Sequence, residues 1–136
     1  MDGPQALVNR LARATNAHDI DALVACFAED YTNETPVHPA RGFRGRDQVR
    51  RNWEQIFAFV PDVRAEVLGC VVDGDTAWTE WEMTGTRKDG SAHLMRGVIM
   101  FGVGGDVAQW ARFYLEPVDE AGETVDDAVR EQIVRP

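Results

Sequence analysis

The residues best suited to proton transfer lie in the second half of the chain. Glu80 and Glu82 are two positions apart, so both fall on one face of an extended strand. A histidine beside a carboxylate can move a proton near neutral pH, and an arginine can hold a carboxylate or enolate oxygen. If neighbouring strands bring them together, the candidate catalytic residues are His93, Arg112, Glu80 and Glu82. The competing interpretation is a salt-bridge network that satisfies these charges on a half-buried sheet.

Other site types are disfavoured by residue type and spacing. The histidines at positions 18, 38 and 93 are far apart in the sequence, so we expect no metal site. The sequence contains no glycine-rich phosphate loop, no Gly-x-Ser-x-Gly elbow and no CxxC pair, so we expect no cofactor. Cys26 and Cys70 stand alone among apolar neighbours, which is typical of reduced core thiols.

Composition limits the partners. The 136 residues carry 14 basic and 23 acidic side chains, a formal net charge of −9 that would repel phosphate backbones. We therefore expect no nucleic-acid partner. No apolar run reaches the roughly 18 residues needed to cross a bilayer, and no basic, apolar export signal opens the sequence. A cytoplasmic protein with no membrane partner is the expectation.

The elements that must position these residues follow from hydrophobic periodicity. Apolar residues at three- and four-residue spacing predict a helix over 5–18, a second from Asp19 to about Asp30, and a third from Asp47 to Pro61. A short extended segment at 31–35 separates the second from the third. After Pro61 the period changes to that of strands, with tight turns between them: Val63–Val72, Thr76–Arg87, Ala92–Val103 and Val107–Pro117.

These elements predict one α+β domain over 1–118. Three N-terminal helices would pack in a strongly curved antiparallel sheet made of a four-strand meander plus one short strand, with Gly85 and Gly97 as bending points. Residues 119–136 form an acidic C-terminal tail whose pattern is compatible with a short helix near Val125–Ile133.

Three stretches resemble the SnoaL-like branch of the nuclear transport factor 2 (NTF2)-like superfamily, which includes the ketosteroid isomerases. Residues 16–23 (NAHDIDAL) with 27–31 (FAEDY) are similar to the opening of these proteins. Residues 42–46 are similar to their Gly-Arg segment before a helix, and 81–90 to their W…GT…G hairpin. The resemblance covers about residues 5–118, most of a domain of typical size. It implies a cone-shaped fold around an apolar pocket.

The catalytic residues of these relatives do not carry over. The positions of the ketosteroid isomerase tyrosine, general-base aspartate and oxyanion-hole aspartate fall on Leu11, Thr35 and near Ile99. A leucine and an isoleucine cannot donate a hydrogen bond or move a proton, so steroid isomerisation by that mechanism is not expected. The Arg-x-Asp of the superfamily's epoxide hydrolases becomes Arg96-Gly97-Val98, and the Gly-Thr-His of polyketide cyclases becomes Gly85-Thr86-Arg87.

The resemblance also implies which strand face looks into the pocket. Together with the third helix and the loop after Pro36, it gives the expected ligand-binding residues Asn33, Thr35, His38, Trp53, Phe57, Trp78, Ile99, Phe101, Trp110 and Tyr114. His38 would act at the cavity mouth or be a surface histidine. A bulge near Gly85 or Gly97 would reverse the phase and turn inward Trp81, Met83, Leu94 and Arg96.

Three functions remain open. The first is a cofactor-independent lyase, isomerase or cyclase that acts on a small apolar, oxygenated substrate with side chains alone. The second is a ligand-binding domain without catalysis, and the third is an interaction domain. We expect a homodimer through the convex sheet face, because the implied phase places an apolar patch there: Trp81, Met83, Leu94, Val98 and Met100.

Overall fold

The computed structural model describes residues 3–134. Its helices are α1 (Pro4–Asn16), α2 (Ile20–Val24), the 3₁₀ turn η1 (Pro39–Arg41), α3 (Arg46–Phe59) and α4 (Val125–Val134). Its strands are β1 (Phe27–Glu34), β2 (Phe43–Arg44), β3 (Arg64–Asp73), β4 (Thr76–Thr86), β5 (Ala92–Gly104) and β6 (Val107–Pro117). The predicted α+β architecture is confirmed.

The six strands form one sheet in the order β2-β1-β6-β5-β4-β3. The strands β3 to β6 are the predicted antiparallel meander. The β1 strand is longer than the predicted 31–35 and runs parallel to β6, while β2 pairs with Thr32 and Asn33 of β1. The second helix is shorter than predicted, because Ala25 is already its C-cap and Phe27 begins β1.

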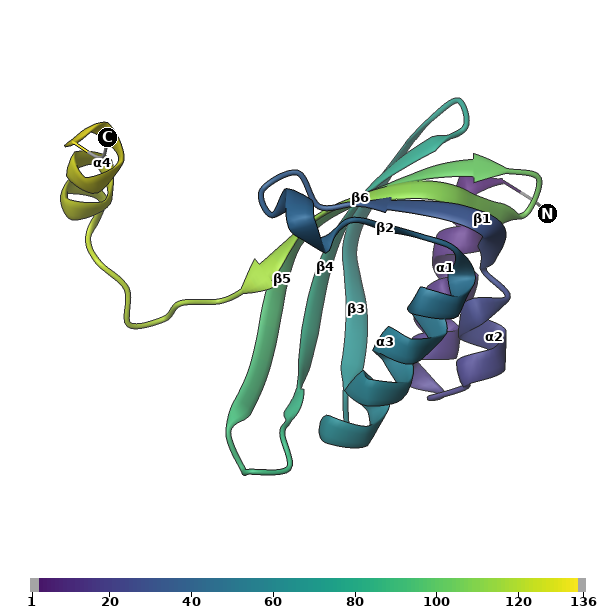
Figure 1. Ribbon diagram of the computed structural model, residues 1–136, viewed down its shortest axis with the longest axis horizontal. Helices are drawn as coiled ribbons and strands as arrows, with labels where there is room; N and C mark the ends of the chain where they lie inside the picture. The colour runs from purple at the N-terminus through teal and green to yellow at the C-terminus, as the bar shows by residue number, and fades with distance from the viewer. Residues whose placement is uncertain (1–2, 135–136) are drawn as a thin grey trace.

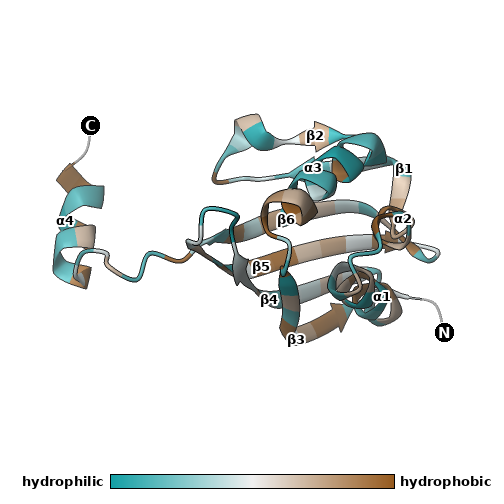
Figure 2. Cartoon of the chain, turned by 90° about the horizontal axis from the view of Figure 1, so that it is seen from below, coloured by the Kyte–Doolittle hydropathy of each residue, from teal (hydrophilic) through white to brown (hydrophobic). Residues whose placement is uncertain are grey.

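The sheet curves around α1, α2 and α3, which all lie on its concave side (Figures 1 and 2). Trp81, Tyr31 and Phe101 are the largest fully buried side chains, and Leu7 and Leu23 pack from the helices into the same core. The indole N–H of Trp81 donates to the Thr79 hydroxyl at 2.6 Å, which in turn donates to the Ile99 carbonyl at 2.6 Å. The core therefore holds its polar atoms in hydrogen bonds.

The α4 helix stands apart from the rest of the fold, at the end of an extended segment that leaves β6 (Figure 1). Its apolar residues Val125, Val129 and Ile133 are exposed. None of the helices within residues 3–134 is both long and apolar enough to cross a membrane.

The edge strand β3 is held by a side chain of α1. Asn16 accepts a hydrogen bond from the Ala65 N–H at 2.7 Å and donates one to the Ala65 carbonyl at 2.9 Å. The side-chain amide of Asn16 thus occupies the position where a further strand would pair with β3. It also links the end of α1 to the sheet.

We predict that Asn16→Ala lowers the free energy of unfolding by about 2 kcal/mol, because both backbone groups of Ala65 lose their partner in a half-buried position. Urea unfolding followed by circular dichroism measures this. Asn9→Ala is the control, since the Asn9 side chain accepts only an exposed hydrogen bond from Gln5. Equal stability of the two variants would contradict the role of Asn16.

Candidate functional site

A cavity of about 360 Å³ lies between α3 and the concave side of the sheet. Its volume is at the lower end of the range for small-molecule sites. Most of the lining is apolar, and the polar groups are few. The lining residues are Phe27, Tyr31, Asn33, Thr35, Arg41, Phe43, Val49, Asn52, Trp53, Ile56, Met83, His93, Met95, Phe113, Leu115 and Glu116.

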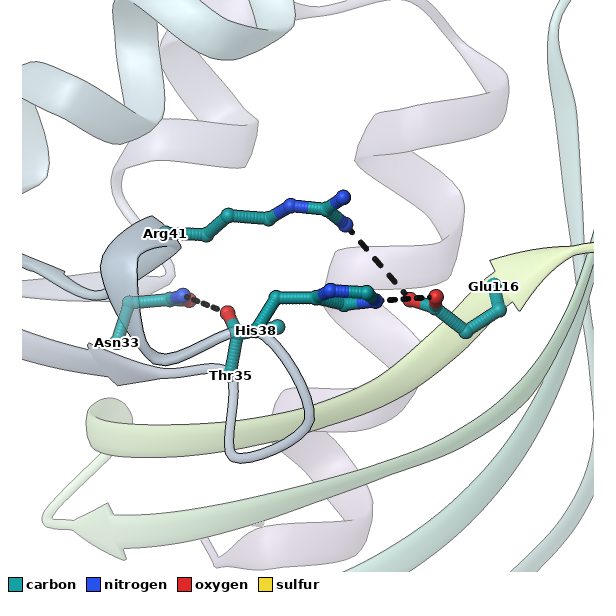
Figure 3. A network of polar contacts seen from close by, with 5 residues as sticks. All are labelled: Asn33, Thr35, His38, Arg41 and Glu116. Carbon is teal, nitrogen blue, oxygen red and sulfur yellow. Dashed lines mark hydrogen bonds and ion pairs between the residues drawn. The ribbon is translucent and has the colours of Figure 1, made fainter. Parts of the chain in front are cut away.

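A polar network joins the loop after β1 to the end of β6 at the rim of this cavity (Figure 3). The Nε2 atom of His38 lies 2.7 Å from Oε1 of Glu116, and Nη1 of Arg41 lies 3.9 Å from the other carboxylate oxygen. The side chains of His38 and Glu116 are 33% and 40% exposed. Both side chains are therefore accessible to solvent, and Glu116 also lines the cavity.

His93 contributes a second imidazole from β5 to the cavity wall. Partial burial lowers the pKa of His93, and the positive charge of Arg87 lowers the pKa further. Both effects disfavour the imidazolium, so His93 is neutral at neutral pH and able to accept a proton.

On β1, Tyr31 and Asn33 form a buried hydrogen-bonded pair. The Tyr31 hydroxyl donates to Oδ1 of Asn33 at 2.7 Å, and Nδ2 of Asn33 lies 3.5 Å from the Thr35 hydroxyl oxygen. Alternation along β1 turns both side chains to the concave side, where Asn33 lines the cavity.

The family model for the SnoaL-like domain matches residues 8–118. The chain therefore belongs to the SnoaL-like family. This confirms the resemblance stated above. No curated protein matches the sequence significantly.

Solved structures with the same fold are distant in sequence. A Mycobacterium tuberculosis protein, RV0760c, in complex with estradiol-17beta-hemisuccinate has a TM-score of 0.73 at 17% identity, over 84% of this chain and 94% of that chain. IdmH from Streptomyces antibioticus, a "putative polyketide cyclase", has a TM-score of 0.72 at 23% identity, over 83% and 91%. A Catenulispora acidiphila protein with a ketosteroid isomerase-like fold, in complex with trimethylamine, has a TM-score of 0.70 at 19% identity, over 82% and 86%.

Several residues expected at the ligand site of this SnoaL-like domain line the cavity or its rim. Asn33, Thr35, Trp53 and His93 line it, and His38 lies at the rim through Glu116. Other expected residues face inward but pack in the hydrophobic core or against other side chains and do not line the cavity. Ile99 and Phe101 are in the core, and Phe57 stacks on His18 at 4.7 Å and packs beside Trp53.

The inward phase predicted for β4 is wrong. Thr79, Trp81 and Met83 are the buried residues of this strand, so Trp78, Glu80 and Glu82 lie on the outer face. Glu82 pairs there with Arg96 at 2.6 Å. Alternation in the sequence favours this phase, since Trp81 and Met83 share one face and the two glutamates share the other; the opposite phase was implied by the family resemblance.

The inward phase predicted for β6 is also wrong. The register between β5 and β6 shifts by one residue near Gly102, so Ala111, Phe113 and Leu115 face inward while Arg112 and Tyr114 face outward. The guanidinium of Arg112 stacks on Trp110 at 4.7 Å and lies 3.5 Å from Glu34. Trp110 itself covers Gly102. The predicted meeting of Arg112, Glu80 and Glu82 with His93 is absent.

Sequence reasoning missed the cavity residues Arg41, Asn52, Phe113 and Leu115. The alternation of Phe113 and Leu115 with charged or polar neighbours was a visible signal for an inward face. Asn52 and Arg41 gave no such signal, because a polar residue on a helix or in a loop is usually solvent-exposed.

The lowered pKa of His93 predicts a pH-dependent stability. As the pH falls through the ordinary histidine pKa of 6.5, the unfolded chain binds a proton at His93 more readily than the folded chain does, so acidification disfavours folding. We expect His93→Gln to lose less stability than the wild type between neutral pH and pH values below the folded pKa of His93. Urea unfolding across this range measures the difference.

Arg87→Gln tests the cause of the shift, and Lys88→Gln is its matched control. Lys88 follows Arg87 in the sequence, but its charge is not among the causes of the lowered pKa of His93. Lys88→Gln should leave the His93 titration, followed by NMR, in place, whereas Arg87→Gln should raise the pKa. A wild type and His93→Gln with parallel pH profiles would contradict the interpretation.

Proposed function

We propose that this SnoaL-like domain binds a small apolar, oxygenated molecule in its cavity and moves a proton on it, as a cofactor-independent isomerase, cyclase or lyase. The observation that carries the proposal is the hydrogen-bonded His38–Glu116 pair at the rim of an apolar cavity. A histidine held by a carboxylate has a defined orientation and a defined free nitrogen, as a proton-transfer group requires.

The geometry assigns the proton-accepting atom. In neutral His38 the nitrogen that faces the Glu116 carboxylate carries the hydrogen, since a carboxylate only accepts. That nitrogen is Nε2, so the lone pair is on Nδ1. When His38 takes up a proton there, Nε2 keeps its hydrogen bond to the carboxylate oxygen at 2.7 Å, so the ring keeps its orientation. The protonated His38 is then the donor for the return step, while neutral His93 on the wall can accept or donate a hydrogen bond to the ligand.

The relatives support the ligand class. RV0760c is in complex with estradiol-17beta-hemisuccinate, an apolar steroid that carries oxygen groups, including a carboxylate. IdmH is described as "a putative polyketide cyclase". The cavity of this chain has the same character, with aromatic and aliphatic walls and a small number of polar groups.

Binding without catalysis is the second candidate. It is favoured by the positions of Leu11, Thr35 and Ile99, where related isomerases have their proton-transfer residues, and by the solvent exposure of the His38–Glu116 pair. A ligand carrier needs the apolar cavity and not the rim histidine.

Solvent exchange tests the two against each other. We predict that the wild type accelerates deuterium exchange at the α-carbon of 2-tetralone in D₂O, and that His38→Gln and Glu116→Gln each slow it by roughly 10²-fold. NMR of the ketone follows the exchange. Glu34→Gln, which alters a glutamate paired with Arg112 on the outer face, is the control and should exchange at the wild-type rate. Bound ketone that exchanges no faster than in buffer would leave only the carrier function.

We also propose that the domain forms a homodimer through the outer face of the sheet. Trp81 and Met83, which the sequence analysis places in this patch, are instead buried in the core. Their place on the outer face is taken by Val71, Trp78 and Tyr114, which are 68%, 49% and 40% exposed. Trp78 is the cross-strand neighbour of Val71 on β3 and of Met100 on β5, so these apolar residues are contiguous on the outer face.

Light scattering should therefore report twice 15.2 kDa, and Trp78→Asp should give the monomer mass, because it places a charge within the apolar patch. Val129→Asp makes the same change on the exposed α4 helix and should leave the dimer intact. Dissociation by the α4 variant and not by Trp78→Asp would place the interface on α4.

A further inference from the structure

Two carboxamide side chains line the cavity, Asn33 from β1 and Asn52 from α3. A carboxamide has an oxygen that only accepts hydrogen bonds and an NH₂ group that only donates them. What each can offer a ligand therefore depends on which of its two ends already has a protein partner.

The oxygen of Asn33 is occupied by Tyr31. The Tyr31 hydroxyl donates to Oδ1 of Asn33 at 2.7 Å, and Tyr31 is 1% exposed. Burial raises the pKa of Tyr31, so its hydroxyl stays protonated and remains a donor. The Nδ2 end of Asn33 has a long contact of 3.5 Å with the Thr35 hydroxyl. The amide N–H is thus the group that Asn33 can present to the cavity.

The oxygen of Asn52 is occupied through a chain that begins at an arginine. Nη2 of Arg51 donates to Oε1 of Gln48 at 2.6 Å, and Nε2 of Gln48 donates to Oδ1 of Asn52 at 2.8 Å. A guanidinium has no acceptor, so Gln48 must turn its oxygen toward Arg51 and its NH₂ toward Asn52. Asn52 is left with its N–H groups to offer, as Asn33 is.

We propose that the cavity selects ligands that carry an acceptor-only oxygen, such as the carbonyl oxygen of a ketone or ester, and that the amide N–H groups of Asn33 and Asn52 bind it. Tyr31 and Gln48 are the positioning residues that fix the two amides. A hydrocarbon of the same shape leaves the amides without a partner, and an alcohol brings an O–H into a mostly apolar lining. The inference rests on the ligand cavity of the proposed function and is independent of the proton transfer.

The experiment compares two ligands with one skeleton, 2-tetralone and its hydrocarbon counterpart tetralin, by titration calorimetry. The quantity measured is the ratio of their dissociation constants in each variant. The double variant Tyr31→Phe/Asn33→Leu removes both partners of the buried 2.7 Å hydrogen bond, so neither partner is left buried without the other. It should lower the preference for the ketone about tenfold, with the loss seen as weaker 2-tetralone binding.

Two single variants test positioning. Tyr31→Phe releases the oxygen of Asn33 and Gln48→Met releases the oxygen of Asn52, while both amides stay in the cavity. Each variant should therefore reduce the ketone preference by weakening 2-tetralone binding. A purely structural role would weaken both ligands alike. Tyr114→Phe removes a tyrosine hydroxyl from the outer face and is the matched control.

The proposal is overturned if the wild type shows no preference for 2-tetralone, whether because both ligands bind equally or because neither binds. It is also overturned if the preference survives both Tyr31→Phe/Asn33→Leu and Asn52→Leu. A ketone preference without deuterium exchange would leave this inference standing and remove the catalytic function. Deuterium exchange without a ketone preference would support the catalytic function and overturn this inference.

Discussion

The fold depends on the close approach of β5 to β6 at Gly97. A Cβ at this position would lie 2.0 Å from the Tyr114 carbonyl oxygen, and the φ of Gly97 is 153°, so only glycine fits without strain. A glycine at such a contact lets the sheet bend where it would otherwise stay flat. Met95 lies beyond the bend on β5, and Leu115, the partner of Gly97 on β6, lies beside it; both line the cavity. The close contact at Gly97 thus lies beside two residues of the cavity wall.

The sequence indicated the elements well, whereas the strand faces implied by the family resemblance were wrong for β4 and β6. Periodicity and turn residues located α1, α3 and the meander, because each has a long, regular pattern. The shift in register near Gly102 leaves no such pattern. It reverses the phase of β6 and sends Arg112 outward, and its signature in the sequence is a glycine opposite a tryptophan. The acid–base group expected around Arg112 depended on that phase.

Charge and burial divide the site into two parts. The ionisable groups His38, Arg41 and Glu116 are at the rim, where water still solvates them, while the cavity interior holds the neutral amide of Asn33. A buried charge costs far more free energy than a buried, hydrogen-bonded amide. Glu82 and Arg112, which were expected in the pocket, instead pair on the outer face with Arg96 and Glu34, where partly exposed ion pairs contribute little to stability. Clusters of charged residues in this sequence therefore indicate the outer surface of the sheet more than the ligand cavity.

The α3 wall of the cavity is held from outside the cavity by His18, the one residue of the α1–α2 turn with a left-handed backbone, at φ 54°. Its ring stacks on Phe57 at 4.7 Å and its Nε2 lies 2.8 Å from the Val63 carbonyl oxygen, so α3 and the start of β3 are tied to the helical turn. Phe57 in turn packs against Trp53, which lines the cavity. The opposite rim is the loop of His38, held to β6 mainly by polar contacts to Glu116. Packed aromatic contacts tolerate little displacement, whereas partly exposed polar contacts exchange readily with water. A ligand in the cavity would therefore contact a tightly packed wall at Trp53, while His38, the residue proposed for proton transfer, belongs to the partly solvated side.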